Sequence, residues 1–311
     1  MTRMLALFPL LLLSGCSDKH YWLFDPKGPI ASAELHYMIL DVLVMLVVII
    51  PVTALTIWVL WRYRAAAQAR HEPGWAHSNV LEFVVWGVPL VIVAILGYYS
   101  YVGIHAVNPY GPEVLAKKSV VETTRQGIAP LEVDVISTDW QWLFVYPKLH
   151  IASANELVVP THVPVHFRLT STTVTNNFFI PQLVGQIYAM PGMRTKQAMI
   201  ADHTGEYHGL AATLSGPGFS WMDFKVKALN EQQFGQWVAG VKGAKAQLTY
   251  AAFDKFAQPT VNTSGKSVYF ANVQPGLFKH VIQEVKAGKV YPTPYAFTEN
   301  MQAPEFTERT N

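Results

Sequence analysis

The sequence predicts a membrane-anchored protein in which a two-helix transmembrane hairpin precedes an external β-sandwich and a C-terminal helical extension rich in aromatic residues. Three observations predict this fold class. Two apolar stretches are each long enough to cross a bilayer. Several short segments then alternate apolar and polar residues as strands do, and the region after residue 228 carries apolar residues at helical spacing.

The composition places part of the chain in a membrane. Apolar residues make up 51% of the 311 residues and charged residues only 14%, against about 25% charged in an average soluble protein. The net charge of +2 gives no large field of one sign, so nucleic acid is not an expected partner. The single cysteine excludes both a disulfide framework and a metal site built from several cysteines.

Residues 1–15 are predicted to be a lipoprotein signal peptide. Arg3 gives a short positive start, and the apolar run Met4–Leu13 is too short to span a bilayer. Leu-Ser-Gly then precedes Cys16, whose thiol we expect to be acylated. The alternative is an ordinary signal peptide with an incidental cysteine. The mature chain would begin with an external segment, residues 16–34.

The transmembrane hairpin is predicted over residues 35–107, with crossings at about 35–61 and 80–102. The connecting loop 62–79 is basic and is therefore expected on the cytoplasmic side, through Arg62, Arg64 and Arg70. Together with the lipoprotein signal, this orientation predicts a multi-pass lipoprotein of the bacterial inner membrane, with its C-terminal domain in the periplasm.

Glu82 lies just inside the second apolar segment. A carboxylate in such a segment is costly and often functional. The alternative is that it reaches the cytoplasmic headgroups and has no further role. Asp41, near the outer end of the first crossing, is interpreted as a solvated end residue.

Residues 108–228 are predicted to form the β-sandwich. Alternating apolar residues mark strands at Leu131–Val135, Val163–Leu169 and Met222–Val226, with turn residues between them. The segment Asp139–Pro147 is dense in aromatic residues, including Trp140. Such a cluster is either part of the core or a contact surface.

The stretch Val174–Met222 carries the most specific pattern. It is interpreted as two loops, Asn176–Pro181 and Tyr207–Phe219, around a half-buried strand at Arg194–Ile200. A β-sandwich brings two such loops to one end.

This stretch resembles subunit II of the haem-copper terminal oxidases. In the cytochrome c oxidase branch, the two loops supply His and Cys-x-Glu-x-Cys-x3-His-x2-Met as ligands of a two-copper centre. In this chain the ligand positions fall, in that order, on Asn176, Ala211, Thr213, Ser215, Phe219 and Met222. Only the methionine is kept, and copper requires thiolate and imidazole donors, so the resemblance implies a degenerate site without metal.

The departures together resemble the quinol oxidase branch of the family, of cytochrome bo type. The resemblance implies a cupredoxin-like sandwich and no cofactor or catalytic residue in this chain. The haems, the active-site copper and the ubiquinol pocket are then expected in the partner subunit I. The other expected partners are the remaining oxidase subunits and membrane lipid, but not soluble cytochrome c. Trp140 would keep the position of an electron-entry residue without that role.

The resemblance also bears on Glu82. Leu81-Glu82 with Trp86 and Pro89 matches a Leu-Glu-x3-Trp-x2-Pro pattern of these oxidases. In the family this glutamate lies at the cytoplasmic entrance of a proton channel of subunit I, which implies a role in the proton pathway.

The remaining residues do not predict another site. His162 and His166 would lie about 13 Å apart along one strand face, too far to share an ion. His203 and His208 lie near several methionines, which are more often core residues than ligands. No catalytic triad or phosphate-binding loop is present.

Residues 229–299 are predicted to be the aromatic-rich extension. Asn230 and Gln233 resemble a capping box ahead of a helix with Phe234, Trp237 and Val241, and residues 277–285 give a second amphipathic helix. The extension is expected to pack against the sandwich or a neighbouring subunit. We expect the polar tail 300–311 to be disordered.

The sequence thus predicts the non-catalytic subunit II of a proton-pumping quinol oxidase. One alternative is a copper-carrying subunit II of a cytochrome c oxidase. The other is an envelope lipoprotein that acts as a scaffold unrelated to respiration.

Overall fold

The computed structural model describes residues 21–65, 74, 77–107, 129–260 and 266–292. The signal peptide, Cys16 and the tail 300–311 lie outside these residues. The chain divides into two compact units, Ala33–Asn108 and the combination of Met1–Ser32 with Pro109–Asn311.

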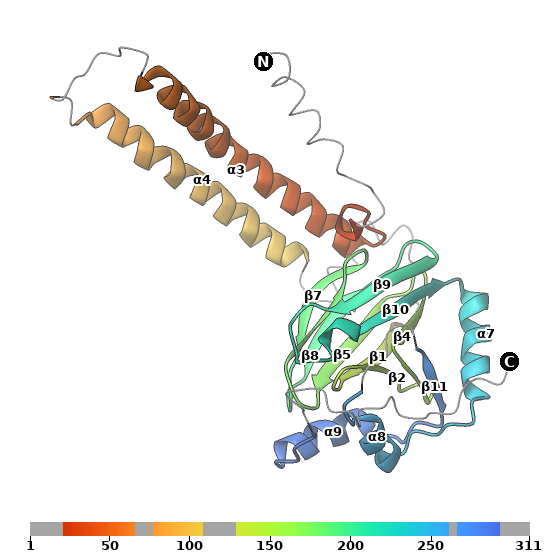
Figure 1. Ribbon diagram of the computed structural model, residues 1–311. Coiled ribbons are helices and arrows are strands. Elements are labelled where there is room, and N and C mark those ends of the chain that lie inside the picture. Colours follow the sequence, from red (N-terminus) through yellow and green to blue (C-terminus); the bar gives the residue numbers. More distant parts are fainter. Residues whose placement is uncertain (1–20, 66–73, 75–76, 108–128, 261–265, 293–311) are drawn as a thin grey trace. The chain divides into compact units, whose positions relative to one another are not determined.

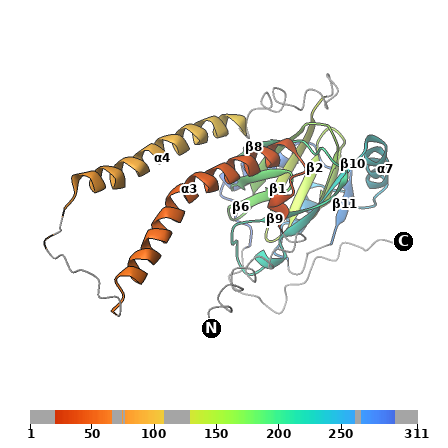
Figure 2. The ribbon, with the colours of Figure 1, turned by 90° about the horizontal axis from the view of Figure 1, so that it is seen from above.

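The smaller unit consists of two long apolar helices, α3 (Pro29–Arg62) and α4 (Asn79–Ala106) (Figure 1). Both are long and apolar enough to cross a membrane. At 34 residues, α3 is about 50 Å long and exceeds a hydrocarbon core of about 30 Å. It begins before residue 35 because proline suits the first position of a helix. Figure 2 shows α3 curved, and Pro51 inside it removes one backbone hydrogen bond.

The larger unit contains two packed sheets. The six-stranded sheet has the order β11-β3-β2-β1-β5-β8 and the five-stranded sheet the order β4-β10-β9-β6-β7. The strands of the first are β1 (Leu131–Ser137), β2 (Trp142–Tyr146), β3 (Ile151–Ala154), β5 (Val165–Ser171), β8 (Thr195–Met199) and β11 (Val268–Ala271). Those of the second are β4 (Glu156–Pro160), β6 (Asn176–Ile180), β7 (Val184–Ala189), β9 (Gly205–Ala211) and β10 (Asp223–Leu229).

An aromatic cluster fills the space between the sheets. The rings of Phe178 and Phe224 stack with centroids 5.3 Å apart, and Trp142, Phe144 and Phe167 contact Phe178. All five side chains are buried, and each contributes roughly 2–3 kcal/mol of burial free energy. The aromatic residues of β2 therefore belong to the core rather than to a contact surface.

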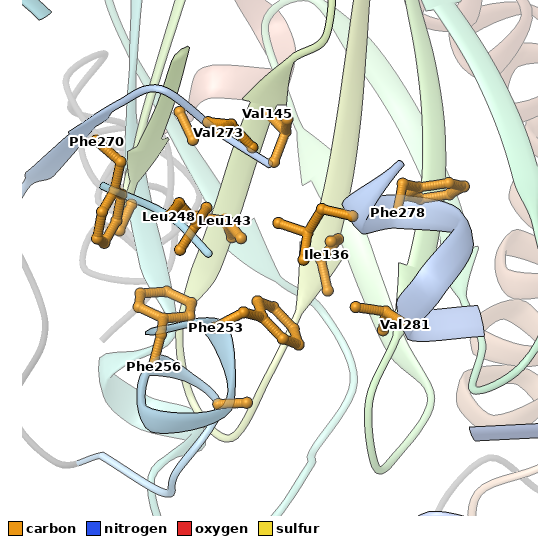
Figure 3. Close-up of a cluster of buried hydrophobic side chains, with 14 of the residues drawn as sticks. Ile136, Leu143, Val145, Leu248, Phe253, Phe256, Phe270, Val273, Phe278 and Val281 are labelled. Atoms are coloured by element: carbon orange, nitrogen blue, oxygen red, sulfur yellow. The ribbon is translucent and has the colours of Figure 1, made fainter. Parts of the chain in front are cut away.

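The six-stranded sheet is also covered on its outer face. Figure 3 shows Leu143 of β2 near Phe253 of α8 (Tyr250–Phe256), and Ile136 of β1 near Phe278 of α9 (Leu277–Lys286). Val145 of β2 belongs to the same buried cluster. Successive residues of a strand point to opposite faces. Because both faces are covered, every residue of β2 is buried.

The C-terminal extension packs on the sandwich in three ways. Helix α7 (Glu231–Lys242) starts at the predicted capping box of Asn230 and Gln233 and lies beside β10 and β11 (Figures 1 and 2). Strand β11 extends the sheet by pairing antiparallel with β3. Helices α8 and α9 form the outer cluster with β2.

The interpretation of residues 176–181 as a loop is wrong. Asn176–Ile180 is strand β6, which lies between β7 and β9, and the second predicted loop begins with β9. Strand β6 is buried nearly throughout, so its sequence does not alternate. Asn177 Nδ2 donates to Gln186 Oε1 at 2.8 Å, whereas the buried Oδ1 atoms of Asn176 and Asn177 have no hydrogen-bond partner among the described residues.

A buried carboxylate joins the extension to the sandwich. Glu156 in β4 has a side chain only 2% exposed, and its Oε2 lies 3.2 Å from Lys227 Nζ. Tyr269 donates to Oε1 at 2.7 Å, and Ser267 donates to Oε2 at 3.1 Å. The charge of Glu156 is thus compensated by one cation and two hydroxyl groups.

We expect Glu156→Ala to lower the free energy of unfolding by about 3 kcal/mol, because it leaves Lys227 and two hydroxyl groups without their acceptor. Chemical unfolding of the purified chain in detergent measures this loss. The matched control is Glu206→Ala. Glu206 lies 4.0 Å from the same lysine but is 73% exposed, so its loss should change stability by less than about 0.5 kcal/mol. Equal losses for the two variants would contradict the role of Glu156.

Candidate functional site

The predicted ligand positions are brought together at one end of the five-stranded sheet. Asn176 begins β6, Ala211 ends β9, and Met222 directly precedes β10. The backbone of Ala211 donates to the carbonyl of Met222 at 3.1 Å, and Ala212 donates to the carbonyl of Asn177 at 3.1 Å. The three segments therefore converge.

The side chains at these positions bond to one another and to the sheet. Asn176 Nδ2 donates to Ser137 Oγ at 3.1 Å. Ser215 Oγ lies 3.8 Å from Met222 Sδ, and both side chains are buried. The remaining two positions, Thr213 and Phe219, are half-buried.

Two tryptophans hold the loop that carries Ser215 and Met222. Trp140 Nε1 donates to the carbonyl of Ser215 at 3.0 Å, and Trp142 Nε1 donates to the carbonyl of Met222 at 3.4 Å. Both indoles are fully buried. The loop approaches Trp140 so closely that a Cβ on Gly218 would lie 2.2 Å from the indole carbons Cδ2 and Cε3. The sequence singled out Trp140 by its resemblance to an electron-entry residue, whereas the hydrogen bond of Trp142 to Met222 was not predicted.

The donor atoms at this end do not suit copper. The six positions offer an amide, two hydroxyl groups, a thioether, a methyl and a phenyl ring, whereas a two-copper centre requires thiolate and imidazole. Within the described ranges, no three His, Cys, Asp or Glu side chains gather as a metal site requires. What the geometry provides is a closed, hydrogen-bonded loop.

His162, His166 and His208 do not occupy the predicted ligand positions, and each has its own local environment. His162 lies in the turn before β5, with φ of 59°, so the expected strand spacing to His166 was wrong. Burial lowers the pKa of His166, which favours its neutral form. The ring of His208 contacts that of Trp22 in a tilted arrangement, with centroids 4.5 Å apart and an interplanar angle of 33°.

A cavity of about 390 Å³ lies between the sandwich and α9. Its lining includes Asp134 and Arg168, which form a bidentate ion pair with N–O distances of 2.5 and 2.8 Å. Burial raises the pKa of Asp134, and the hydrogen bond and charge of Arg168 oppose that rise. The charges of the pair compensate each other. The other lining residues with ionisable side chains are His150, Arg194 and Lys279.

Glu82 lies in the first turn of α4, four residues after the N-cap residue Ser78. Its Oε1 is 2.8 Å from Nδ1 of His77, and both side chains are more than half exposed. His77 was not predicted as a functional residue, because residues 62–79 were interpreted only as a connecting loop. A titratable residue next to the helix start was the available signal.

Comparison with known proteins matches two regions of the larger unit. Residues 144–229, from β2 to β10, match the family model "Cytochrome C oxidase subunit II, periplasmic domain". Residues 242–288, which include α8, β11 and α9, match the "COX Aromatic Rich Motif".

Full-length relatives extend the match to most of the chain. It is 42% identical to cytochrome bo(3) ubiquinol oxidase subunit 2 of Pseudomonas aeruginosa, over 90% of this chain and 80% of that protein. It is 37% identical to the protein of the same name from Pseudomonas putida, over 91% and 86%. The chain belongs to the ubiquinol oxidase subunit II family. Ubiquinol oxidase subunit 2 of Acetobacter aceti, 37% identical over 93% of this chain and 89% of that protein, is a further relative.

The two matched regions of this subunit II are packed together in one unit. The periplasmic-domain match supplies Leu143 and Val145, and the aromatic-rich match supplies Phe253, Phe256 and Phe278 to the same buried cluster. The expected cupredoxin-like sandwich and its extension are therefore confirmed as a single packed body.

We expect Gly218→Ala to destabilise subunit II by about 1–3 kcal/mol, because the added methyl would overlap the indole of Trp140. Thermal unfolding followed by tryptophan fluorescence measures the loss. The matched control is Gly235→Ala in α7, where a Cβ meets nothing within 4 Å. Alanine should stabilise that helix by up to ~1 kcal/mol. A Gly218→Ala protein as stable as the unsubstituted chain would contradict the close packing of the loop on Trp140.

Proposed function

We propose that this chain serves as the non-catalytic subunit II of a membrane complex that oxidises ubiquinol, reduces dioxygen to water and translocates protons. The observation that carries the proposal is the donor set at Asn176, Ala211, Thr213, Ser215, Phe219 and Met222, which lacks thiolate and imidazole. The names of the relatives, ubiquinol oxidase subunit 2, support it. Electrons then reach the complex from a quinol in the bilayer and not from a soluble cytochrome c.

In this proposal the reaction belongs to a partner. Subunit I holds the haems, the copper of the oxygen site and the quinol pocket. The present chain binds and covers that subunit together with the other oxidase subunits, and it carries no cofactor of its own.

The proposed location is the bacterial inner membrane. Helices α3 and α4 form the two crossings. Arg62 ends α3, Arg64 follows it, and both favour a cytoplasmic connection, which leaves the sandwich in the periplasm. Acylation of Cys16 would add a lipid anchor at the start of the mature chain.

Purification of the tagged chain in mild detergent tests this function. We expect haem-containing partners to co-purify and the sample to consume oxygen with ubiquinol but not with reduced soluble cytochrome c. Turnover with cytochrome c, or the EPR signal of a mixed-valence copper pair in this chain, would instead support the copper-carrying alternative. A chain that purifies without haem would support the scaffold alternative.

Glu82 is proposed to contribute to proton uptake. It lies at the start of α4, in the Leu-Glu-x3-Trp-x2-Pro pattern, and its carboxylate contacts His77. An exposed carboxylate beside an imidazole at a helix start is accessible to protons from the aqueous phase. The pair is suited to collecting protons for a channel in subunit I.

We expect Glu82→Gln to lower quinol-driven oxygen consumption about tenfold, as an increase of about 1.4 kcal/mol in the barrier does. The haem spectrum and the subunit content should be unchanged. Asp41→Asn in α3 is the matched control, because it also removes one carboxylate from a membrane-spanning segment and should leave turnover unchanged. Unchanged turnover in the Glu82→Gln complex would remove this residue from the proton pathway.

A further inference from the structure

Residues 21–28, which we term the strap, are fixed to the sandwich through their backbone. Lys27 N donates to the carbonyl of Gln182 at 2.7 Å, and the carbonyl of Lys27 accepts from Asp202 N at 2.9 Å. Gln182 Nε2 also donates to the carbonyl of Asp25 at 3.2 Å. The strap thus bridges the turn between β6 and β7 and the segment that follows β8.

Both ends of the strap have further contacts. At its end, a Cβ on Gly28 would lie 2.5 Å from the carbonyl oxygen of Ile200, so only glycine fits this approach. Near its start, the indole of Trp22 lies on the imidazole of His208. The strap is therefore positioned by backbone bonds, close packing and a ring contact.

Despite this fixed backbone, the strap exposes a continuous apolar sequence. Tyr21, Trp22, Leu23 and Phe24 are 47%, 37%, 36% and 61% exposed. Four large apolar side chains in succession on the surface of a soluble domain would be unfavourable, and such patches mark contact with a partner or a membrane.

The length of the chain limits how far this sequence can lie from the bilayer. Phe24 lies within about 18 Å of the start of α3 at Pro29, because an extended chain covers at most about 3.5 Å per residue. The crossing expected from about residue 35 begins about 9 Å further along the helix. The strap has a second tether in the proposed function, because Cys16, with its lipid, is only a few residues before Tyr21.

We infer that Tyr21–Phe24 form an interfacial anchor whose partner is the headgroup region of the outer leaflet. Tyrosine and tryptophan favour this region because their rings are apolar and their polar groups stay hydrated. The nearby charges of Lys27 and Asp25 pair with each other at 2.6 Å, so they leave no excess charge to repel the surface. This inference rests on the membrane location given under the proposed function.

The anchor has a mechanical consequence. Because the strap is bonded to the turn at Gln182 and to Asp202, insertion of its aromatic rings also fixes this end of the sandwich at the membrane surface. A flexible linker of the same length would not transmit such a restraint.

Site-specific photocrosslinking in the complete complex tests the anchor. Phe24 is replaced by benzoyl-phenylalanine, and the complex is irradiated in nanodiscs of bacterial phospholipids. We expect mass spectrometry to find phospholipid adducts on the peptide that contains position 24. The matched control is benzoyl-phenylalanine at Val290, which is 89% exposed on the extension and should give no lipid adduct.

The outcomes distinguish the lipid anchor from the proposed oxidase function. Crosslinks from position 24 to another protein subunit, or no crosslink at that position, would overturn the lipid anchor. The haem spectrum and the quinol-driven oxygen consumption of the same sample test the proposed function independently. Lipid adducts in a sample without haem would leave the anchor in place and reject only the oxidase assignment.

Discussion

The structure of the periplasmic-type domain depends on a sheet that is apolar on both faces. In β2, Trp142, Phe144 and Tyr146 serve the core between the sheets, and Leu143 and Val145 serve the cluster under α8 and α9. A sandwich of two sheets normally leaves its outer faces to water. Here the outer face would be exposed without the extension, so the two regions that match separate family models form one folding unit.

The loop that carries Ser215 and Met222 is held by neutral groups of the sandwich. The indoles of Trp140 and Trp142 donate to the carbonyls of Ser215 and Met222, and Gly218 allows the loop to rest on one of the rings. Several modest hydrogen bonds and close packing together are sufficient for order. The loop at this end of the sandwich is therefore closed by hydrogen bonds to two buried indoles.

The sequence predicted the elements whose signals are local. Two long apolar helices, the capping box of α7 and the amphipathic pattern of α9 follow from spacing within one segment. Strand β6 was missed because burial on both faces removes the alternation that marks a strand. The parallel pairing of β1 with β5 was beyond local patterns, since it depends on tertiary arrangement. The contact of His77 with Glu82, five residues apart at a helix start, is local and was missed. The six ligand positions stay a prediction from the resemblance, because a donor atom can be identified from the sequence but its role cannot.

The late position of β11 in the chain has a consequence for biogenesis. Ribosomes complete Ile151–Ala154 long before Val268–Ala271, so β3 emerges as an edge with unpaired N–H and C=O groups. Such distant pairing is slow to form. A nascent or truncated chain that lacks residue 268 onward would expose this edge to pairing with another strand. By pairing β11 with β3, the aromatic-rich extension therefore also protects this edge from pairing with a strand of a neighbouring molecule.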